Sequence, residues 1–382
     1  MKIALVSRFC DKRQGIPYVV AELAERFVRE HEVHVFTQSW KDINDKRIIF
    51  HKVPVITQRW YFNFLEFFLI SGIMLRKHKF DIINLHDPCW YPGSVVTCHA
   101  LPRAGIKFVR SLNNLEKEKI NFRYYLPFMV LNSIFEYNFR IRKWGKIIAV
   151  STKIQEELSE FLHIPKKNIV VISNGVDLKK FKPDKRGQYR REILDRHNLR
   201  EEDFILLFVG YGYLRKGLQF LLKTLSLIRN NQLKLLVVGN DDTRNLNFIV
   251  SMVKSLNLKK KVIFAGTRSD VFKYYVASNA FVLPTLYEPF GNVILEAMAS
   301  GLPVIVSRLA GASELIQDGK NGILINDPTN IEEIANKIKL LLNNRQLRSF
   351  LGENARKTAE NYSWDIIAEK TLSVYKEVIK GE

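Results

Sequence analysis

The stretch AFVLPTLYEPFGNVILEAMASGLPVIVS, residues 280–307, contains a complete strand, helix and strand. The segments 280–285 and 302–307 are short and almost continuously apolar, as expected of strands that are buried on both faces. Between them we predict a turn at 286–291 and a helix at 292–301, which Gly301 and Pro303 end. Because a helix that joins two buried strands is the building unit of a parallel sheet, this stretch predicts an α/β fold.

The same alternation extends over the whole chain. Apolar runs typical of buried strands recur in both halves, and amphipathic segments such as 218–230 and 246–258 lie between them. These runs are at 2–7, 32–37, 80–86, 94–99, 146–151, 205–210, 233–239 and 262–266. A chain of 382 residues also exceeds what one core usually supports. We therefore predict two doubly wound domains, 1–180 and 181–362, followed by an amphipathic helix at 363–382.

Composition restricts the partners and the compartment. The formal net charge is +20, which favours anionic partners such as phosphates, an acidic membrane surface or nucleic acid. A merely basic, solvated surface is the alternative. No recognition helix, RNA-stacking motif or zinc finger is present, so we expect no nucleic-acid partner. Three cysteines (Cys10, Cys89 and Cys98) form no disulfide pattern, and the N-terminus lacks a signal peptide, which indicates a cytoplasmic protein.

Two carboxylates flank the start of the predicted helix at 292–301. Glu288 precedes this helix and Glu296 lies about one turn inside it, with the free helical amides near Gly291, Asn292 and Val293 between them. A carboxylate among apolar neighbours needs hydrogen-bond donors, and the ribose of a nucleotide would supply them to Glu296. A buried structural salt bridge remains the alternative for Glu296, and a solvated loop charge for Glu288.

Basic and polar residues also follow other strands. Arg215 and Lys216 stand just before a predicted helix that begins near Gly217, an arrangement that suits a diphosphate without a metal. Gly15 lies in the first strand–helix turn, where no Gly-x-Gly-x-x-Gly follows, which disfavours a dehydrogenase. His86 and His99 each end a strand. A structural role is favoured for His86.

Two segments mix aromatic and basic residues, namely 59–80 and 103–146. The uncharged part of 59–80 is shorter than the roughly 20 residues of a membrane-spanning helix. Interfacial attachment to an anionic membrane would use this mixture of side chains, and core helices with basic outer faces would use it equally. Both interpretations stay open from the sequence.

In combination, these motifs resemble the retaining GT-B glycosyltransferases of the family-four type, the glycosyl transferases group 1, which include sucrose synthase and mannosyl- and lipopolysaccharide glucosyltransferases. The resemblance is carried by EPFGNVILEAMASGLPV (288–304), by RKG (215–217) and by NGVDLKKFKP (174–183). It implies two Rossmann-like domains that face a central cleft, with the C-terminal helix packing back toward the first domain.

The resemblance also implies a role for each site residue. Arg215 and Lys216 would bind the donor diphosphate, Glu296 the ribose and Glu288 the hydroxyls of the donor sugar. The remaining residues would complete the donor site: Gly291, Asn292 and Val293 at the sugar or phosphate, Thr267 and Arg268 near the base, Gly15 at the phosphate, and His99 as a catalytic residue beside the sugar. The first-turn Gly-Gly of many members is Gln14-Gly15 here.

The implied reaction moves a hexose-type sugar from a nucleoside diphosphate sugar, such as a UDP- or GDP-sugar, to a glycan, glycolipid or lipid-linked acceptor. It would proceed with retention and without a metal or other cofactor, in polysaccharide or glycolipid biosynthesis, in the cytoplasm or peripherally at the inner membrane face. Two alternatives remain: a sugar-nucleotide 2-epimerase of the same architecture, and a non-catalytic lectin-like or scaffold protein, which the intact motif residues disfavour.

Overall fold

The computed structural model describes residues 1–12, 15–43, 45–57, 59–104 and 125–381. The described chain divides into two compact units. Unit 1 comprises Met1–Asn174 and Trp364–Glu382, and unit 2 comprises Gly175–Ser363. The observed boundary and the one predicted after residue 180 lie in the same connecting segment.

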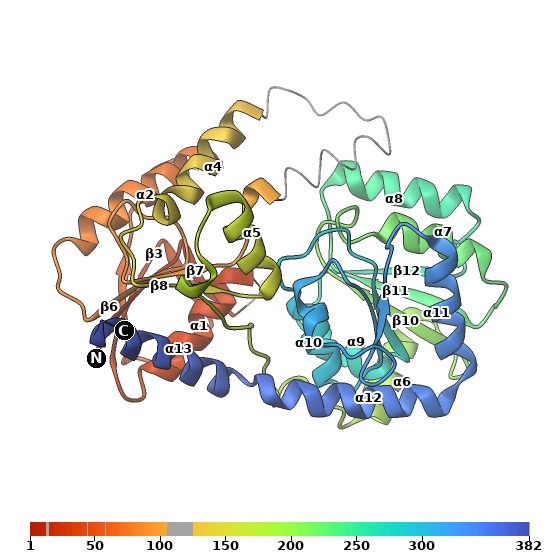
Figure 1. Cartoon of the computed structure of the whole chain (residues 1–382). Helices are drawn as coiled ribbons and strands as arrows, with labels where there is room; N and C mark the ends of the chain where they lie inside the picture. Colours follow the sequence, from red (N-terminus) through yellow and green to blue (C-terminus); the bar gives the residue numbers. More distant parts are fainter. Residues whose placement is uncertain (13–14, 44, 58, 105–124, 382) are drawn as a thin grey trace. The chain divides into compact units, whose positions relative to one another are not determined.

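Unit 1 contains a seven-stranded sheet in which all paired strands are parallel (Figure 1). The strand order is β5-β3-β1-β6-β7-β8-β9. Their bounds are β1 (Lys2–Val6), β3 (Glu32–Thr37), β5 (Ile49–Lys52), β6 (Ile82–Leu85), β7 (Val95–Cys98), β8 (Lys146–Ala149) and β9 (Ile169–Val171), with a separate pair β2 (Phe9–Asp11) and β4 (Ser39–Lys41). The central strands β6 and β7 are buried throughout, as their apolar runs predict.

Helices connect the strands of unit 1. Their bounds are α1 (Gly15–Phe27), α2 (Trp60–Leu75), α4 (Tyr125–Arg140), α5 (Thr152–Leu162), the short 3₁₀ helix η2 (Lys166–Asn168), and the C-terminal α13 (Trp364–Lys380). The carboxyl ends of parallel strands meet at one edge of the sheet, so the polar residues that follow β6 and β7 lie close together.

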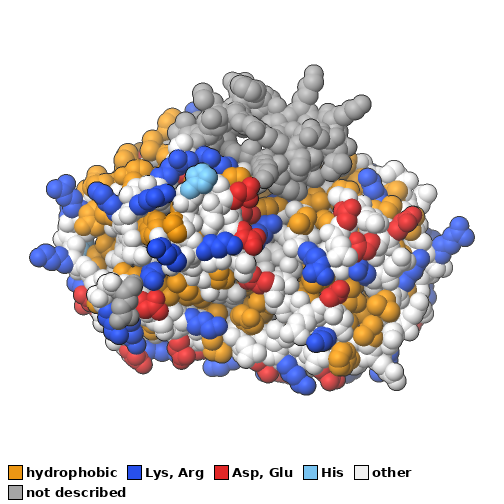
Figure 2. All heavy atoms as spheres, viewed as in Figure 1, with side chains coloured by type: hydrophobic (Ala, Val, Ile, Leu, Met, Phe, Trp, Pro, Cys, Tyr) orange, Lys and Arg blue, Asp and Glu red, His pale blue; other side chains and the backbone are white. Residues whose placement is uncertain are grey.

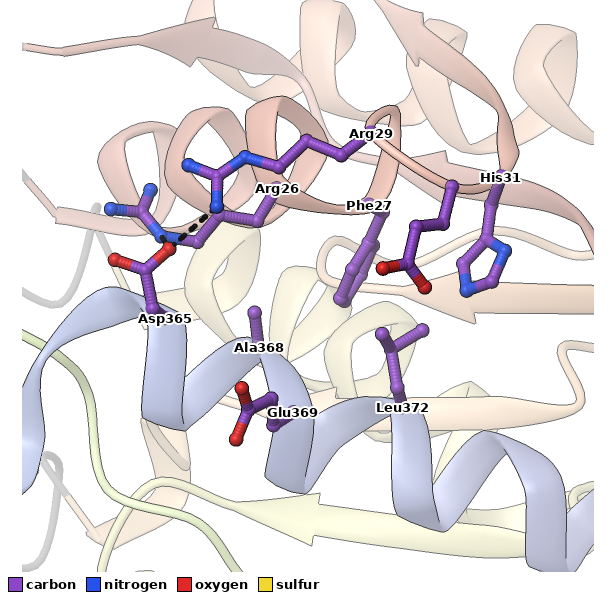
Figure 3. Close-up of a pocket in the computed structure, with 9 residues that line it drawn as sticks. Arg26, Phe27, Arg29, His31, Asp365, Ala368, Glu369 and Leu372 are labelled. Carbon is purple, nitrogen blue, oxygen red and sulfur yellow. Dashed lines mark hydrogen bonds and ion pairs between the residues drawn. The ribbon is translucent and has the colours of Figure 1, made fainter.

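Helix α13 packs against α1, as the family resemblance implies. The indole of Trp364 donates to Tyr18 Oη at 3.2 Å, and Phe27 meets Tyr375 edge-on with ring centroids 5.6 Å apart. Figure 3 shows the guanidinium groups of Arg26 and Arg29 turned toward Asp365, whose Oδ1 lies 2.8 Å from Arg29 Nη1. The last helix of the chain is therefore an integral part of unit 1.

Unit 2 contains a six-stranded parallel sheet in the order β12-β11-β10-β13-β14-β15. Its strands are β10 (Phe204–Val209), β11 (Leu233–Val238), β12 (Val262–Gly266), β13 (Ala280–Leu283), β14 (Val304–Ser307) and β15 (Ile323–Ile325). Strands β10, β11 and β12 follow one another toward one edge of the sheet, whereas β13, β14 and β15 follow one another toward the other edge, starting next to β10. The order of the strands therefore reverses between β10 and β13. This reversal is the topological switch point at which such sheets bind ligands.

The helices of unit 2 cover both faces of this sheet (Figure 1). They are α6 (Arg186–His197), α7 (Leu218–Leu227), α8 (Thr243–Ser255), α9 (Val271–Ala277), α10 (Asn292–Ala299), η3 (Gly311–Leu315), α11 (Ile331–Asn343), α12 (Arg345–Ala359) and η4 (Glu360–Tyr362). Polar caps begin several of them; Asp242, for example, accepts from the Asn245 N–H at 2.9 Å. The unit predicted from residues 280–307 is present as β13, α10 and β14.

Lys and Arg side chains are distributed over the visible face of the molecule, with Asp and Glu among them (Figure 2). Among the described residues, no helix is long and apolar enough to cross a membrane.

Candidate functional site

Arg215 and Lys216 lie in the loop between β10 and α7. The Lys216 side chain is buried, and its aliphatic part crosses directly over Gly210: a Cβ atom added at Gly210 would lie 2.4 Å from Lys216 Cδ. Gly210 also has a positive φ of 155°, so a glycine is required both by the backbone and by the space that the lysine occupies. The loop thus directs the ammonium group to a fixed position.

Both cations contact one oxygen of Glu288. Lys216 Nζ donates to Glu288 Oε2 at 2.8 Å, and Arg215 Nη1 donates to the same oxygen at 3.0 Å. Burial alone raises the pKa of the Glu288 carboxyl, but the charges and hydrogen bonds of Lys216 and Arg215 outweigh burial and hold its pKa below the ordinary value. The carboxylate is therefore ionised and forms a compact cluster with two cations, which the sequence did not predict.

The backbone around Glu288 is held by neighbouring loops. The Gly311 N–H donates to the Glu288 carbonyl at 2.9 Å, and Arg215 Nη1 donates to the Tyr287 carbonyl at 2.7 Å. Because the Arg215 guanidinium contacts both the backbone and the side chain of this loop, the β10–α7 and β13–α10 loops form one structure.

Helix α10 begins beside this cluster. Gly291 precedes the helix with φ 103°, and a Cβ atom there would lie 3.1 Å from Glu288 Cγ. Asn292 and Val293 form the first turn, whose N–H groups have no acceptor in a preceding helical turn. The helix N-terminus adds a partial positive charge to that of Arg215 and Lys216. An anion would be stabilised strongly at this place.

Glu296 lies one turn further along α10 and is only partly exposed. Its Oε2 accepts a hydrogen bond from Tyr275 Oη at 2.8 Å. Burial raises the pKa of the Glu296 carboxyl, although the hydrogen bond from Tyr275 and the charges of Lys180 and Lys216 oppose this. Within the described residues, no salt bridge to Glu296 is present. Unit 2 therefore does not show the buried structural salt bridge that is the alternative role of Glu296.

Thr267 and Arg268 are exposed in the turn between β12 and α9. Within the described part of the chain, no hydrogen bond or ion pair joins either residue to Glu288 or Glu296. Their predicted role near the base stays a prediction.

Gly15 and His99 belong to unit 1. Gly15 is the exposed first residue of α1 and has φ 71°, and a Cβ atom there would approach only Pro17 at 3.9 Å. His99 follows β7, and its Nε2 lies 2.9 Å from His86 Nδ1, with the two rings stacked. Burial lowers the pKa of His99 to about 4 and lowers that of His86 well below its ordinary value. Both imidazoles are therefore neutral near pH 7.

The two histidines line a cavity of about 190 Å³ whose walls are mainly apolar, including Phe135 and Phe139. His86 Nε2 is buried without a hydrogen-bond partner in the structure. From the sequence, a structural role is favoured for His86, and its pairing with His99 is not predicted. The only available signal was that both histidines end neighbouring strands.

Among the described residues, no group of three or more His, Cys, Asp or Glu side chains could hold a metal ion. All three cysteines are buried and free.

The two parallel α/β units, one of them with Arg215 and Lys216 beside a helix N-terminus, have the architecture of a GT-B glycosyltransferase. Residues 189–358 match the family model of glycosyl transferases group 1, and residues 13–180 match that of glycosyltransferase family 4. The chain belongs to these GT-B, family-four-type glycosyltransferases.

Known proteins resemble the chain over its full length. The capsular polysaccharide biosynthesis glycosyltransferase CapM of Staphylococcus aureus is 26% identical over 390 residues, which cover 100% of this chain and 99% of CapM. The solved structure of WaaG, a glycosyltransferase involved in lipopolysaccharide biosynthesis, matches with a TM-score of 0.79 at 21% identity and covers 98% of this chain and 99% of WaaG. HepE of Anabaena in complex with UDP-glucose matches with a TM-score of 0.76 at 18% identity, covering 99% and 100%. The two structures confirm the fold.

Proposed function

We propose that this protein transfers a hexose-type sugar from a nucleoside diphosphate sugar to a glycan or lipid-linked acceptor, with retention of configuration and without a metal. The cluster of Arg215, Lys216 and Glu288 beside the α10 N-terminus carries this proposal. HepE has a similar fold and binds UDP-glucose, and CapM takes part in capsular polysaccharide synthesis, so a UDP-sugar and a cell-surface glycan are the first candidates. Because CapM and WaaG are glycosyltransferases, glycosyl transfer is favoured over the alternative of a sugar-nucleotide 2-epimerase.

The donor diphosphate would lie at Arg215, Lys216 and the first amides of α10. When the bond between the sugar C1 and the phosphate oxygen breaks, the oxygen keeps the electron pair and negative charge develops on the diphosphate. Two fixed cations and a helix N-terminus stabilise that charge with little reorganisation. They would supply the stabilisation for which other enzymes use a metal ion.

Glu288 would bind hydroxyl groups of the donor sugar rather than attack it. Its carboxylate is held by two cations, and its lowered pKa makes it a weak nucleophile. In the proposed step the acceptor oxygen bonds to C1 on the face that the diphosphate leaves, and the proton of the acceptor hydroxyl passes to the departing phosphate oxygen. The neutral His99 would contact the sugar through hydrogen bonds.

Glu296 would bind the ribose. It is a partly exposed carboxylate in an apolar helix, it accepts a hydrogen bond from Tyr275, and burial raises its pKa. Ribose hydroxyls would donate the missing hydrogen bonds.

An anionic membrane surface is the proposed docking partner of α2. Four large apolar side chains are 38–53% exposed along this helix: Phe62, Leu65, Leu69 and Ile73. Their spacing places them on one face of the helix, while Phe64 and Phe68 on another face pack against Phe135 and Tyr137. The exposed cations Arg76, Lys77 and Lys79 follow the helix, which complements anionic headgroups. Residues 105–124 of the second predicted membrane segment, 103–146, lie outside the described residues.

A panel of nucleotide sugars tests the donor proposal. At a concentration near 100 Kd, a bound donor should raise the thermal midpoint by about 5–10 °C. The panel contains UDP-glucose, UDP-N-acetylglucosamine, UDP-galactose and GDP-mannose, with UMP as the control that lacks a second phosphate. Transfer to a glycan acceptor in the presence of EDTA then tests the metal-free mechanism. The proposal fails if no nucleoside diphosphate or its sugar stabilises the protein.

A further inference from the structure

Tyr275 is a buried tyrosine whose hydroxyl contacts the candidate ribose ligand. It lies on α9, is fully buried, and donates from Oη to Glu296 Oε2 at 2.8 Å. Its ring meets Phe181 edge-on with centroids 5.8 Å apart and lies 6.0 Å from the ring of Phe281. Because these aromatic neighbours fix the ring, the hydroxyl cannot turn away from Glu296 without a change in the core.

The hydrogen bond runs in one direction only. Burial, followed by the charge of Glu296, raises the pKa of Tyr275 well above its ordinary value, so the phenol keeps its proton. The Tyr275 hydroxyl is the donor and Glu296 Oε2 is the acceptor. Within the described residues, Glu296 Oε1 has no hydrogen-bond partner. One carboxylate oxygen is thus held by the protein while the other stays available to a ligand.

We propose that Tyr275 is a positioning residue for nucleotide binding, which holds the Glu296 carboxylate in the orientation that receives the ribose hydroxyls. The inference rests on the proposed function, in which Glu296 binds ribose. The electrostatic surroundings explain why a positioning group is needed. The charges of Lys180 and Lys216 both act on Glu296. Within the described residues, the hydrogen bond from Tyr275 is the only one to this carboxylate, so without it the carboxylate would lose its fixed orientation.

The neighbouring Tyr274 provides a matched control. It is also fully buried on α9, but its Oη lies 3.1 Å from His197 Nε2 and 3.3 Å from Arg196 Nη1, both on α6. Tyr274→Phe therefore removes an equally buried hydroxyl from the same helix without touching Glu296.

The experiment compares UDP with 2′-deoxy-UDP and 3′-deoxy-UDP by calorimetry, or the corresponding guanosine nucleotides if the thermal panel selects GDP-mannose. We expect the wild type and Tyr274→Phe to bind the ribonucleotide about tenfold more tightly than a deoxy form, as for a hydrogen bond to a charged group. In Tyr275→Phe this preference should fall to about twofold, because the ribonucleotide alone loses affinity. Tyr275→Met, which also lacks the hydroxyl but fills space differently, should show the same reduced preference.

The outcomes separate the two proposals. If the wild type binds all three nucleotides equally, the ribose role of Glu296 is refuted, and the positioning role with it. If the wild type discriminates and both Tyr275 variants discriminate equally well, the positioning role alone is refuted. A purely structural role of Tyr275 would weaken all three nucleotides alike and leave the preference near tenfold, which also overturns the inference.

Discussion

The Glu288 carboxylate lies where an anionic ligand of Lys216 and Arg215 would bind, because its Oε2 accepts hydrogen bonds from Lys216 at 2.8 Å and from Arg215 at 3.0 Å. In the proposed function the same two cations bind the donor diphosphate. A bound diphosphate must then compete with Glu288 for Lys216 and Arg215, and the displaced carboxylate becomes available to the sugar.

Glu288→Gln should consequently separate binding from transfer. Removal of the competing negative charge should tighten UDP binding about fivefold at low salt, since charges a few ångströms apart interact by about 1 kcal/mol even at high dielectric constant. Transfer should fall by at least about a hundredfold, because the charged contact to the sugar is lost. Calorimetry and a transfer assay measure the two effects. Glu192→Gln, which removes an equal charge from an ion pair with Lys273 and Arg196, is the control. Weaker UDP binding by Glu288→Gln contradicts the competition.

Removal of either cation should weaken nucleotide binding. Lys216→Ala and Arg215→Ala should each lower the affinity for UDP by about 10- to 100-fold, the effect of losing a charge-assisted hydrogen bond to phosphate. Lys223→Ala removes an exposed cation from the next helix, α7, and should leave the affinity unchanged. Equal affinities for all three variants in calorimetry would place the diphosphate elsewhere.

How much of this site the sequence could predict depends on the range of the interactions involved. Strand β10 was predictable because all its residues are apolar and buried, whereas β5, at the edge of its sheet, has exposed and half-buried residues and was missed. The spacing of Glu288 and Glu296 around a helix start was also local information. The contacts of Tyr275 with Glu296 and of Lys216 with Glu288 join residues from different elements, and no local pattern encodes such pairs.

Glu296 should reduce stability at neutral pH. Burial raises its pKa in the folded state, so the folded protein binds more protons than the unfolded chain between the two pKa values, and stability falls as the pH rises through this range. Glu296→Gln should therefore raise the thermal midpoint at pH 7 while it weakens UDP binding. Glu333→Gln is the opposite control: burial raises the pKa of Glu333, but hydrogen bonds from the Asn326 and Asp327 N–H groups outweigh it, so this substitution should lower the midpoint. A lower midpoint for Glu296→Gln contradicts the prediction.

The histidine pair should make unit 1 sensitive to acid. Burial lowers the pKa of His99 to about 4 and lowers that of His86 well below its ordinary value, so the unfolded chain binds more protons below pH 6.5, and stability is lost as the pH falls from 6.5 toward 4. The double variant His86→Asn, His99→Asn should therefore lose less stability than the wild type over this range. Thermal midpoints measured from pH 7.5 to 4.5 test this difference. His51, whose pKa burial also lowers to about 4, is present in both proteins and cancels in the comparison. Parallel pH curves would show that the pair does not titrate as described.

The exposed face of α2 should bind anionic vesicles. Phe62→Ser with Ile73→Ser removes two of its apolar side chains, which are 47% and 53% exposed, and should reduce co-sedimentation with phosphatidylglycerol-containing vesicles about tenfold or more, because each buried apolar side chain contributes about 1.5–3 kcal/mol. Binding by the wild type should weaken with salt, since the cations after α2 interact with the headgroups through screened charges. Leu340→Ser with Phe350→Ser removes side chains of similar exposure, 48% and 51%, from unit 2 and controls for general loss of hydrophobicity. If both double variants sediment like the wild type, or if neutral phosphatidylcholine vesicles bind equally well, α2 is not the membrane-docking surface and its apolar face has another partner.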